Sequence, residues 1–130
     1  MKYEAEYGFD IRIWLRDGRA SEIEEAIGMK SSKSHNKGDR RPRGDHSPYK
    51  DTFCSFSIFE QKETSPEDII ADGLKLISGL SERLERPIES IWFIVKILDP
   101  NLVVINLDTD SISGLAEAGC EISFENQMPS

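Results

Sequence analysis

Alternation of hydrophobic and polar residues is the clearest pattern along this chain. Between Tyr3 and Leu15 every second residue is apolar, a period of two that predicts a strand with one buried face. The aromatic stretch 53–59 and the closing stretch 120–125 repeat this pattern and predict two more strands. The run 91–98 is almost continuously apolar, which is typical of a strand covered over most of its length, and we expect its Trp92 to lie in the core.

Three stretches instead space their apolar residues three and four apart, as helices do. In the first, Ser21 and Glu24 form an expected capping box, and Gly28 is expected to end the helix. The second begins at Ser65-Pro66 and should run as one helix to about Glu85. The third is expected over 110–119.

A turn sequence, Asp99-Pro100-Asn101, separates the run 91–98 from the apolar stretch 102–107 and predicts an antiparallel hairpin. The expected order is therefore β-α-β-α-β-β-α-β within a single domain spanning 1–130. This order predicts an α+β fold, loosely ferredoxin-like: a mixed, largely antiparallel five-stranded sheet with two to three helices mainly on one face.

The outer face of such a sheet would carry Trp14, flanked by Arg12 and Arg16. An exposed tryptophan between two arginines is the composition of an interface anchor. A loop covering Trp14 is the alternative. These three residues are therefore candidate binding residues.

The segment 29–50 differs from the rest of the chain, because it holds seven bases and two acids and few large apolar groups. The other residues hold nine bases and 22 acids, and the net charge of the whole chain is −8. Loops of this length are usually functional or disordered, so we expect a long, exposed and flexible basic loop. Its guanidinium groups could grip a phosphate, or they could pair with the protein's own acids. The candidate binding residues in this loop are Lys37, Asp39, Arg40, Arg41 and Arg43.

Several short features follow one another in a familiar order. They are the helix ending in Ile27-Gly28, the loop with Lys37-Gly38-Asp39, the apolar run 91–98 and the closing sequence from Gly119 to Phe124. This succession resembles the bacterial family catalogued as domain of unknown function 4279, although Phe53 stands where that family often has a tryptophan. The resemblance implies the fold and a bacterial, intracellular setting, and it carries over no activity and no catalytic residue.

Catalytic chemistry has few candidates, because both histidines fall in the basic segment. Cys54 with His46 would be a nucleophile and its base, but a mobile loop is a poor place for a preorganised base. Cys54 and Cys120 are interpreted as buried, inert thiols. We predict no catalytic residue, no metal and no cofactor, and whether the protein is an enzyme stays open, with a non-catalytic role favoured. A metal site would have to draw its ligands from His35, Asp39, Asp45 and His46, whose spacing matches no known motif.

The start of the chain, Met1–Glu6, lacks the apolar region of a secretory signal, and no apolar stretch approaches the roughly 20 residues of a membrane span. We therefore expect a cytoplasmic protein that does not enter membranes, and its negative charge disfavours nucleic acid as a partner. The size and charge favour a small acidic binding protein of the bacterial immunity type, which sequesters a cognate toxin or another protein. The alternatives are a phosphate or nucleotide binder or minor enzyme that uses the basic loop, and a structural homodimer built on the Trp14 face.

Overall fold

A single five-stranded sheet organises the computed structural model, which describes residues 7–44, 46–60, 66–97 and 105–126. The strand order is β2-β3-β1-β4-β5, with β1 in the centre and antiparallel to both β3 and β4. β2 is antiparallel to β3 at one edge, and β5 is parallel to β4 at the other. The expected α+β class with a mixed, largely antiparallel sheet is therefore confirmed. The strands are β1 (Tyr7–Leu15), β2 (Lys33–His35), β3 (Thr52–Glu60), β4 (Ser90–Ile97) and β5 (Cys120–Asn126).

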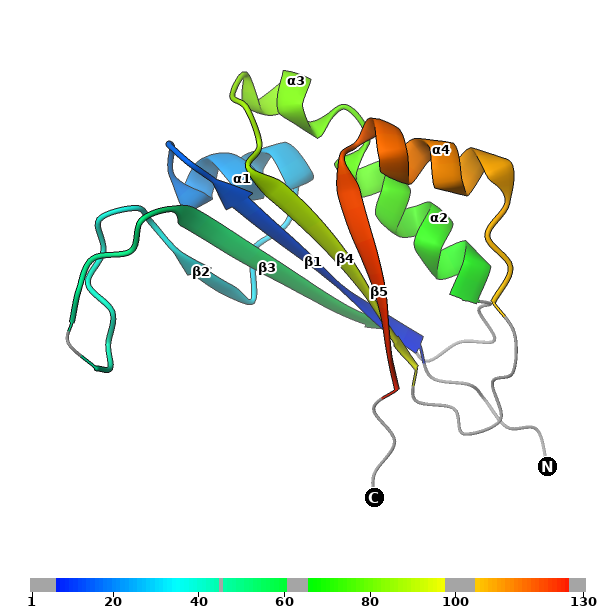
Figure 1. Cartoon of the computed structure of the whole chain (residues 1–130), viewed down its shortest axis with the longest axis horizontal. Helices are drawn as coiled ribbons and strands as arrows, with labels where there is room; N and C mark the ends of the chain where they lie inside the picture. The colour runs from blue at the N-terminus through cyan, green and yellow to red at the C-terminus, as the bar shows by residue number, and fades with distance from the viewer. Residues whose placement is uncertain (1–6, 45, 61–65, 98–104, 127–130) are drawn as a thin grey trace.

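The helices cover one face of this sheet (Figure 1). They are α1 (Ala20–Ile27), α2 (Pro66–Ile77), α3 (Leu80–Leu84) and α4 (Thr109–Glu117). Alternate residues of the three inner strands point toward them and form the core, where Ile11, Phe56 and Phe93 are almost fully buried. None of the described helices combines the length and the hydropathy that crossing a bilayer requires.

The predicted hairpin between 91–98 and 102–107 is wrong where the structure describes it. Residues 105–107 are not in a strand, and residues 98–104 lie outside the described residues. Both edges of β4 are already taken, one by β1 and the other by β5, so no edge is left for a hairpin partner. The strand that completes the five-stranded sheet is therefore not 102–107 but β2, which lies within the basic segment 29–50. The chain order thus differs from the expected one, and the ferredoxin-like comparison is not confirmed.

The long helix expected from Ser65 to Glu85 is broken into α2 and α3. Gly79 lies between them with φ of +67°, a left-handed conformation that glycine adopts without strain. The Arg83 guanidinium donates hydrogen bonds of 2.6 Å to the carbonyls of Leu76 and Ser78, and one of 3.2 Å to the carbonyl of Ala26. Arg83 therefore caps the end of α2 and ties it to α1.

The capping box expected at Ser21 is also wrong. The N-cap is Arg19 rather than Ser21, so the helix begins at Ala20, whose N–H donates to the Asn36 side chain at 2.7 Å. The Glu24 carboxylate accepts two hydrogen bonds from Ser31 instead, which lowers the pKa of Glu24. A residue from beyond the helix thus supplies the N-terminal cap that the local sequence was expected to provide.

Candidate functional site

Four aromatic rings line up across the outer face of the sheet, the face without helices. The strand register places His35, Phe53 and Trp14 side by side on β2, β3 and β1. The rings of Trp14 and Phe53 have centroids 4.9 Å apart, and those of Phe53 and His35 are 5.4 Å apart. Tyr49 lies flat on His35 at 3.6 Å, and the Arg41 guanidinium lies 5.2 Å from the Tyr49 ring centroid. We call these four rings the aromatic stack.

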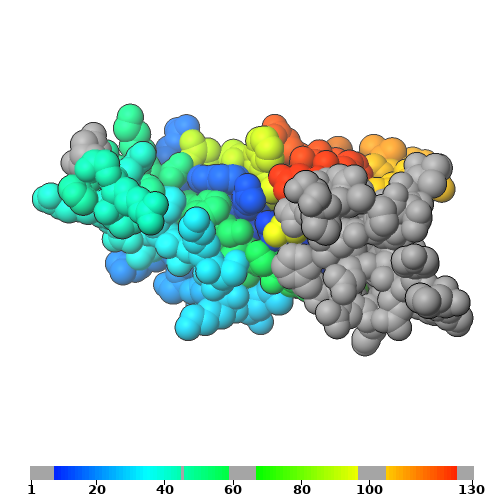
Figure 2. All heavy atoms as spheres, turned by 90° about the horizontal axis from the view of Figure 1, so that it is seen from below, coloured from blue at the N-terminus to red at the C-terminus, as the bar shows by residue number. Residues whose placement is uncertain are grey.

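The aromatic stack anchors a hairpin, residues 36–50, which we call the basic arm. Across this hairpin the Tyr49 N–H donates to the Asp39 carbonyl at 2.8 Å, and the Gly38 N–H donates to the Tyr49 carbonyl at 3.0 Å. The Arg41 N–H donates to the Ser47 carbonyl at 3.2 Å. Figure 1 shows the arm projecting beyond one end of the sheet, and in Figure 2 its cyan to green atoms lie at one end of the molecule. The segment 29–50 therefore contains a strand and a hydrogen-bonded hairpin that the sequence analysis did not predict.

The candidate residues in and near this arm have different roles. Lys37 forms an ion pair of 2.8 Å with Asp17, which lowers the pKa of Asp17. The Asp39 carboxylate accepts from the Asn36 N–H at 2.9 Å and so stabilises the turn into the hairpin. Three candidate arginines are exposed, and among the described residues no carboxylate lies within ion-pair distance of them: Arg16, Arg40 and Arg43.

Arg12 belongs to a polar cluster around the buried carboxylate of Asp10, which is 3% exposed. Lys96 Nζ lies 2.9 Å from this carboxylate, Arg12 lies 3.5 Å from it, and the Ser57 hydroxyl donates to it at 2.6 Å. Arg12 therefore helps to neutralise a buried acid.

Trp92, which pairs with Arg12 in the register, is 40% exposed. The prediction that Trp92 lies in the core is wrong, because its position in the alternation of β4 faces away from the helices.

The helical layer carries the opposite charge. Its two basic residues are Lys75 and Arg83. The nine acidic residues within the four helices are Glu22, Glu24, Glu25, Glu67, Asp68, Asp72, Glu82, Asp110 and Glu117. One end of the molecule is thus basic and the layer above the sheet is acidic.

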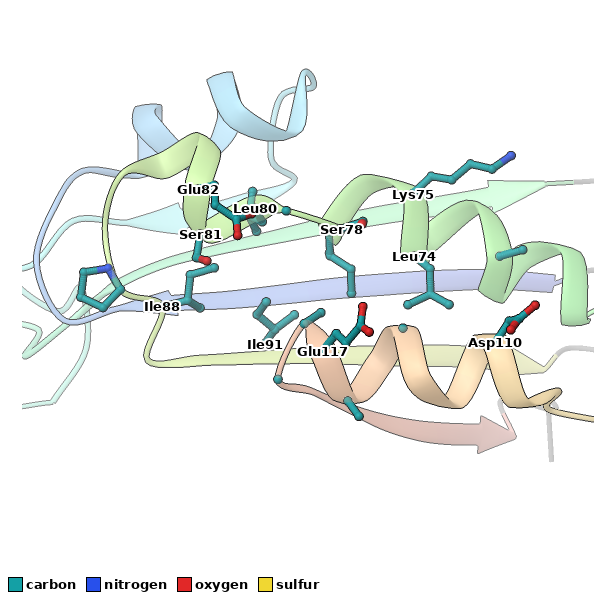
Figure 3. Close-up of a pocket in the computed structure, with 18 residues that line it drawn as sticks. Leu74, Lys75, Ser78, Leu80, Ser81, Glu82, Ile88, Ile91, Asp110 and Glu117 are labelled. Carbon is teal, nitrogen blue, oxygen red and sulfur yellow. The ribbon is translucent and has the colours of Figure 1, made fainter.

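An open groove of about 830 Å³ runs between α2, α3 and α4 in this acidic layer (Figure 3). Leu74, Ile88 and Ile91 contribute apolar side chains to it. The acids that line it are Glu82 on α3 and Asp110 and Glu117 on α4. The groove therefore combines an apolar lining with negative charge.

The three groove acids have no ion pair within the part of the chain that the structure describes. The one basic residue among the lining side chains is Lys75, which lies 3.9 Å from Asp72 on its own helix and extends away from α4 in Figure 3. Such a groove can accept a cationic segment that also carries apolar side chains. The sequence alone does not indicate this groove, because α3 and α4 are distant in the chain and only the fold places Glu82 and Glu117 on one groove.

Cys54 and His46, the pair that was considered and disfavoured as a nucleophile and its base, do not form a catalytic pair. Cys54 is fully buried on the helix side of β3, where burial raises the pKa of its thiol to about 11. His46 is exposed in the basic arm, where its Nδ1 donates to the Arg41 carbonyl at 2.9 Å. Burial also raises the pKa of Cys120 to about 12. Both thiols are therefore protonated and poorly nucleophilic near neutral pH.

The suggested metal ligands do not cluster either. His35 stacks on Tyr49 and its Nε2 lies 3.4 Å from Asp51, whereas Asp39 is used in the turn. Asp45 lies outside the described residues. Within those that are described, no three His, Cys, Asp or Glu side chains come close enough together to hold a metal ion.

No family model, no curated protein and no solved structure matches this chain. The similarity to the domain of unknown function 4279 family therefore stays a prediction, and the two charged surfaces are the basis for proposing a function.

Proposed function

We propose that this protein is a non-catalytic binding module of the bacterial immunity type, which captures a basic protein partner in the groove between α2, α3 and α4. The observation that carries the proposal is the groove itself: its three acids lack ion pairs among the described residues and surround an apolar lining. Its volume of about 830 Å³ falls within the range of roughly 300–1,000 Å³ that is usual for binding pockets.

Charge and apolar surface would have separate roles in this binding. The acidic layer attracts a cationic partner over a distance of about 8–10 Å at ordinary salt and speeds its approach. Burial of apolar side chains against Leu74, Ile88 and Ile91 would then supply the binding free energy. A basic amphipathic helix has both features, since its apolar residues can enter a groove while lysines and arginines meet the rim.

The binding site is tested with two fluorescent helical peptides of equal length, one with leucines on one face and lysines on the other, and one with glutamates in place of the lysines. We expect the protein to bind the basic peptide, to bind the acidic peptide at least tenfold more weakly, and to lose affinity for the basic peptide as salt is raised. The double variant Asp110→Lys and Glu117→Lys should lose at least tenfold in affinity. A matched control, Glu25→Lys with Glu89→Lys, changes the net charge equally on exposed residues outside the groove and should keep most of the binding.

Two outcomes would contradict the groove as the site: equal binding of both peptides, or an equal loss in the control variant. The immunity role has its own test in cells. The products of the genes beside this one are expressed singly, with and without this protein. A toxic neighbour whose effect is suppressed by the wild type but not by the Asp110→Lys, Glu117→Lys variant supports the role, and the absence of any suppressed toxicity counts against it.

A further inference from the structure

We infer that the same groove also receives the basic arm of a second copy of this chain, so that copies associate head to tail. The inference rests on the groove of the proposed function, but it assigns an occupant whose chemistry is known, because both surfaces belong to this protein.

The arm is shaped and charged for such a contact. It contains Lys37, Arg40, Arg41, Arg43 and Lys50, against Asp39 and Asp45. Its backbone is paired across the hairpin, and the stacking of Tyr49 on His35 fixes it to the sheet, so it would lose little conformational freedom on docking. Arg40 and Arg43 are exposed, with no ion pair to any described residue.

The arm and the groove cannot meet within one molecule. The arm projects from one end of the long axis, whereas α2 and α4 lie toward the other end (Figure 1). A contact between them therefore joins two copies through two different surfaces, a heterologous contact that leaves one free arm and one free groove at the ends of each assembly. Such assemblies lengthen as the protein concentration rises.

Exposed ion pairs are weak and are screened by salt, so the association should be weak and salt-sensitive. It would also compete with the basic partner of the proposed function for the same groove. High protein concentration would then mask the groove, and binding of the partner would separate the copies.

Sedimentation velocity measures the association from micromolar to about millimolar protein, at about 20 mM and about 500 mM salt. We expect wild-type chains to associate at low salt and to separate at high salt. The variants Arg40→Glu with Arg43→Glu, and Asp110→Lys with Glu117→Lys, should each be monomeric alone. An equimolar mixture of the two should associate again, because the unchanged arm of the second variant meets the unchanged groove of the first.

Charge reversal outside the contact is the matched control: Arg19→Glu with Lys30→Glu should associate like the wild type, and circular dichroism checks that every variant is folded. A wild-type chain that stays monomeric at low salt, or a mixture that does not associate, overturns the inference. Association that survives both double variants but is lost in Trp14→Asp would point to a dimer through the outer sheet face and would overturn it as well.

The result separates this inference from the proposed function. The Arg40→Glu, Arg43→Glu variant keeps an unchanged groove, so it should still bind the basic peptide while failing to self-associate. Self-association without peptide binding would refute the proposed partner alone, and peptide binding without self-association would refute the head-to-tail contact alone. If a fluorescent single-stranded oligonucleotide binds through Arg40 and Arg43 while the wild type stays monomeric, the arm's partner is nucleic acid and the inference is wrong.

Discussion

The packing of α2 against the sheet depends on Gly73, where there is no room for a side chain. Gly73 is buried where α2 crosses β4, and a Cβ built on it would lie 2.4 Å from Cζ and 2.5 Å from Cε2 of Phe93. Phe93 is 1% exposed, and its ring centroid lies 5.2 Å from that of Phe9. The ring therefore has little room to move away, and Gly73→Ala should push α2 slightly away from the sheet.

Two effects of this substitution oppose each other. Alanine stabilises a helix relative to glycine by roughly 1 kcal/mol. Overpacking a tight core costs about 1–3 kcal/mol, and the contact at 2.4 Å places Gly73→Ala at the upper end of that range. We therefore expect Gly73→Ala to lower the free energy of unfolding by about 1–2 kcal/mol, which corresponds to a fall in Tm of about 3–10 °C.

Chemical denaturation followed by circular dichroism measures this change, with Gly114→Ala in α4 as the matched control. A Cβ at Gly114 would lie 3.5 Å from the nearest atom of Leu74, an ordinary contact, so the control should be neutral or stabilising. In the double variant Gly73→Ala with Phe93→Leu, the smaller leucine side chain should relieve the close contact. The double variant should therefore lose less free energy of unfolding than the sum of the losses in the two single variants. The reasoning is refuted if Gly73→Ala stabilises the protein as much as Gly114→Ala does, or if the double variant shows no coupling.

Three further predictions concern the outer face, the arm and the last helix. Asp10→Ala should lower the free energy of unfolding in urea by about 2–4 kcal/mol, because it breaks the buried ion pair between Asp10 and Lys96 and removes the acceptor of the Ser57 hydroxyl; a loss below about 0.5 kcal/mol would contradict this. Tyr49→Ala should release the basic arm, so that trypsin cleaves after Arg43 at least tenfold faster than in the wild type, whereas an unchanged rate would mean that the stack does not fix the arm. The hydrogen bond from the Ser111 N–H lowers the pKa of Asp108 below 3.8, so this cap stabilises α4 fully above that ordinary value and its contribution is lost as the pH falls through the lowered pKa. Asp108→Ala should therefore reduce Tm at pH 6 more than at pH 2, and an equal reduction at both would refute the role of the carboxylate.

Most of the elements could be predicted because their signals are local. The alternation in β1, β3 and β5 can be recognised within each stretch, because burial of one face selects every second residue. The apolar run of β4 is visible within its own stretch as well. Gly28 ends α1 with φ of +84° for an equally local reason, because glycine adopts the left-handed conformation without strain. The acidic body and the basic segment follow from the order of the charged residues alone.

Partners across the fold could not be predicted, because they depend on residues far apart in the chain. Lys33–His35 has no apolar alternation and becomes a strand only because the edge of β3 is open to it. Asn36 caps α1, and β5 rather than the stretch 102–107 occupies the second edge of β4, for the same kind of reason. The groove needed Glu82 and Glu117, from helices separated by β4, to be brought to one surface. The sequence thus determined most of the strands and helices and where charge lies. The tertiary structure alone decided that Lys33–His35 forms a strand, which edges pair and which charges share a surface, because those choices are made by long-range packing.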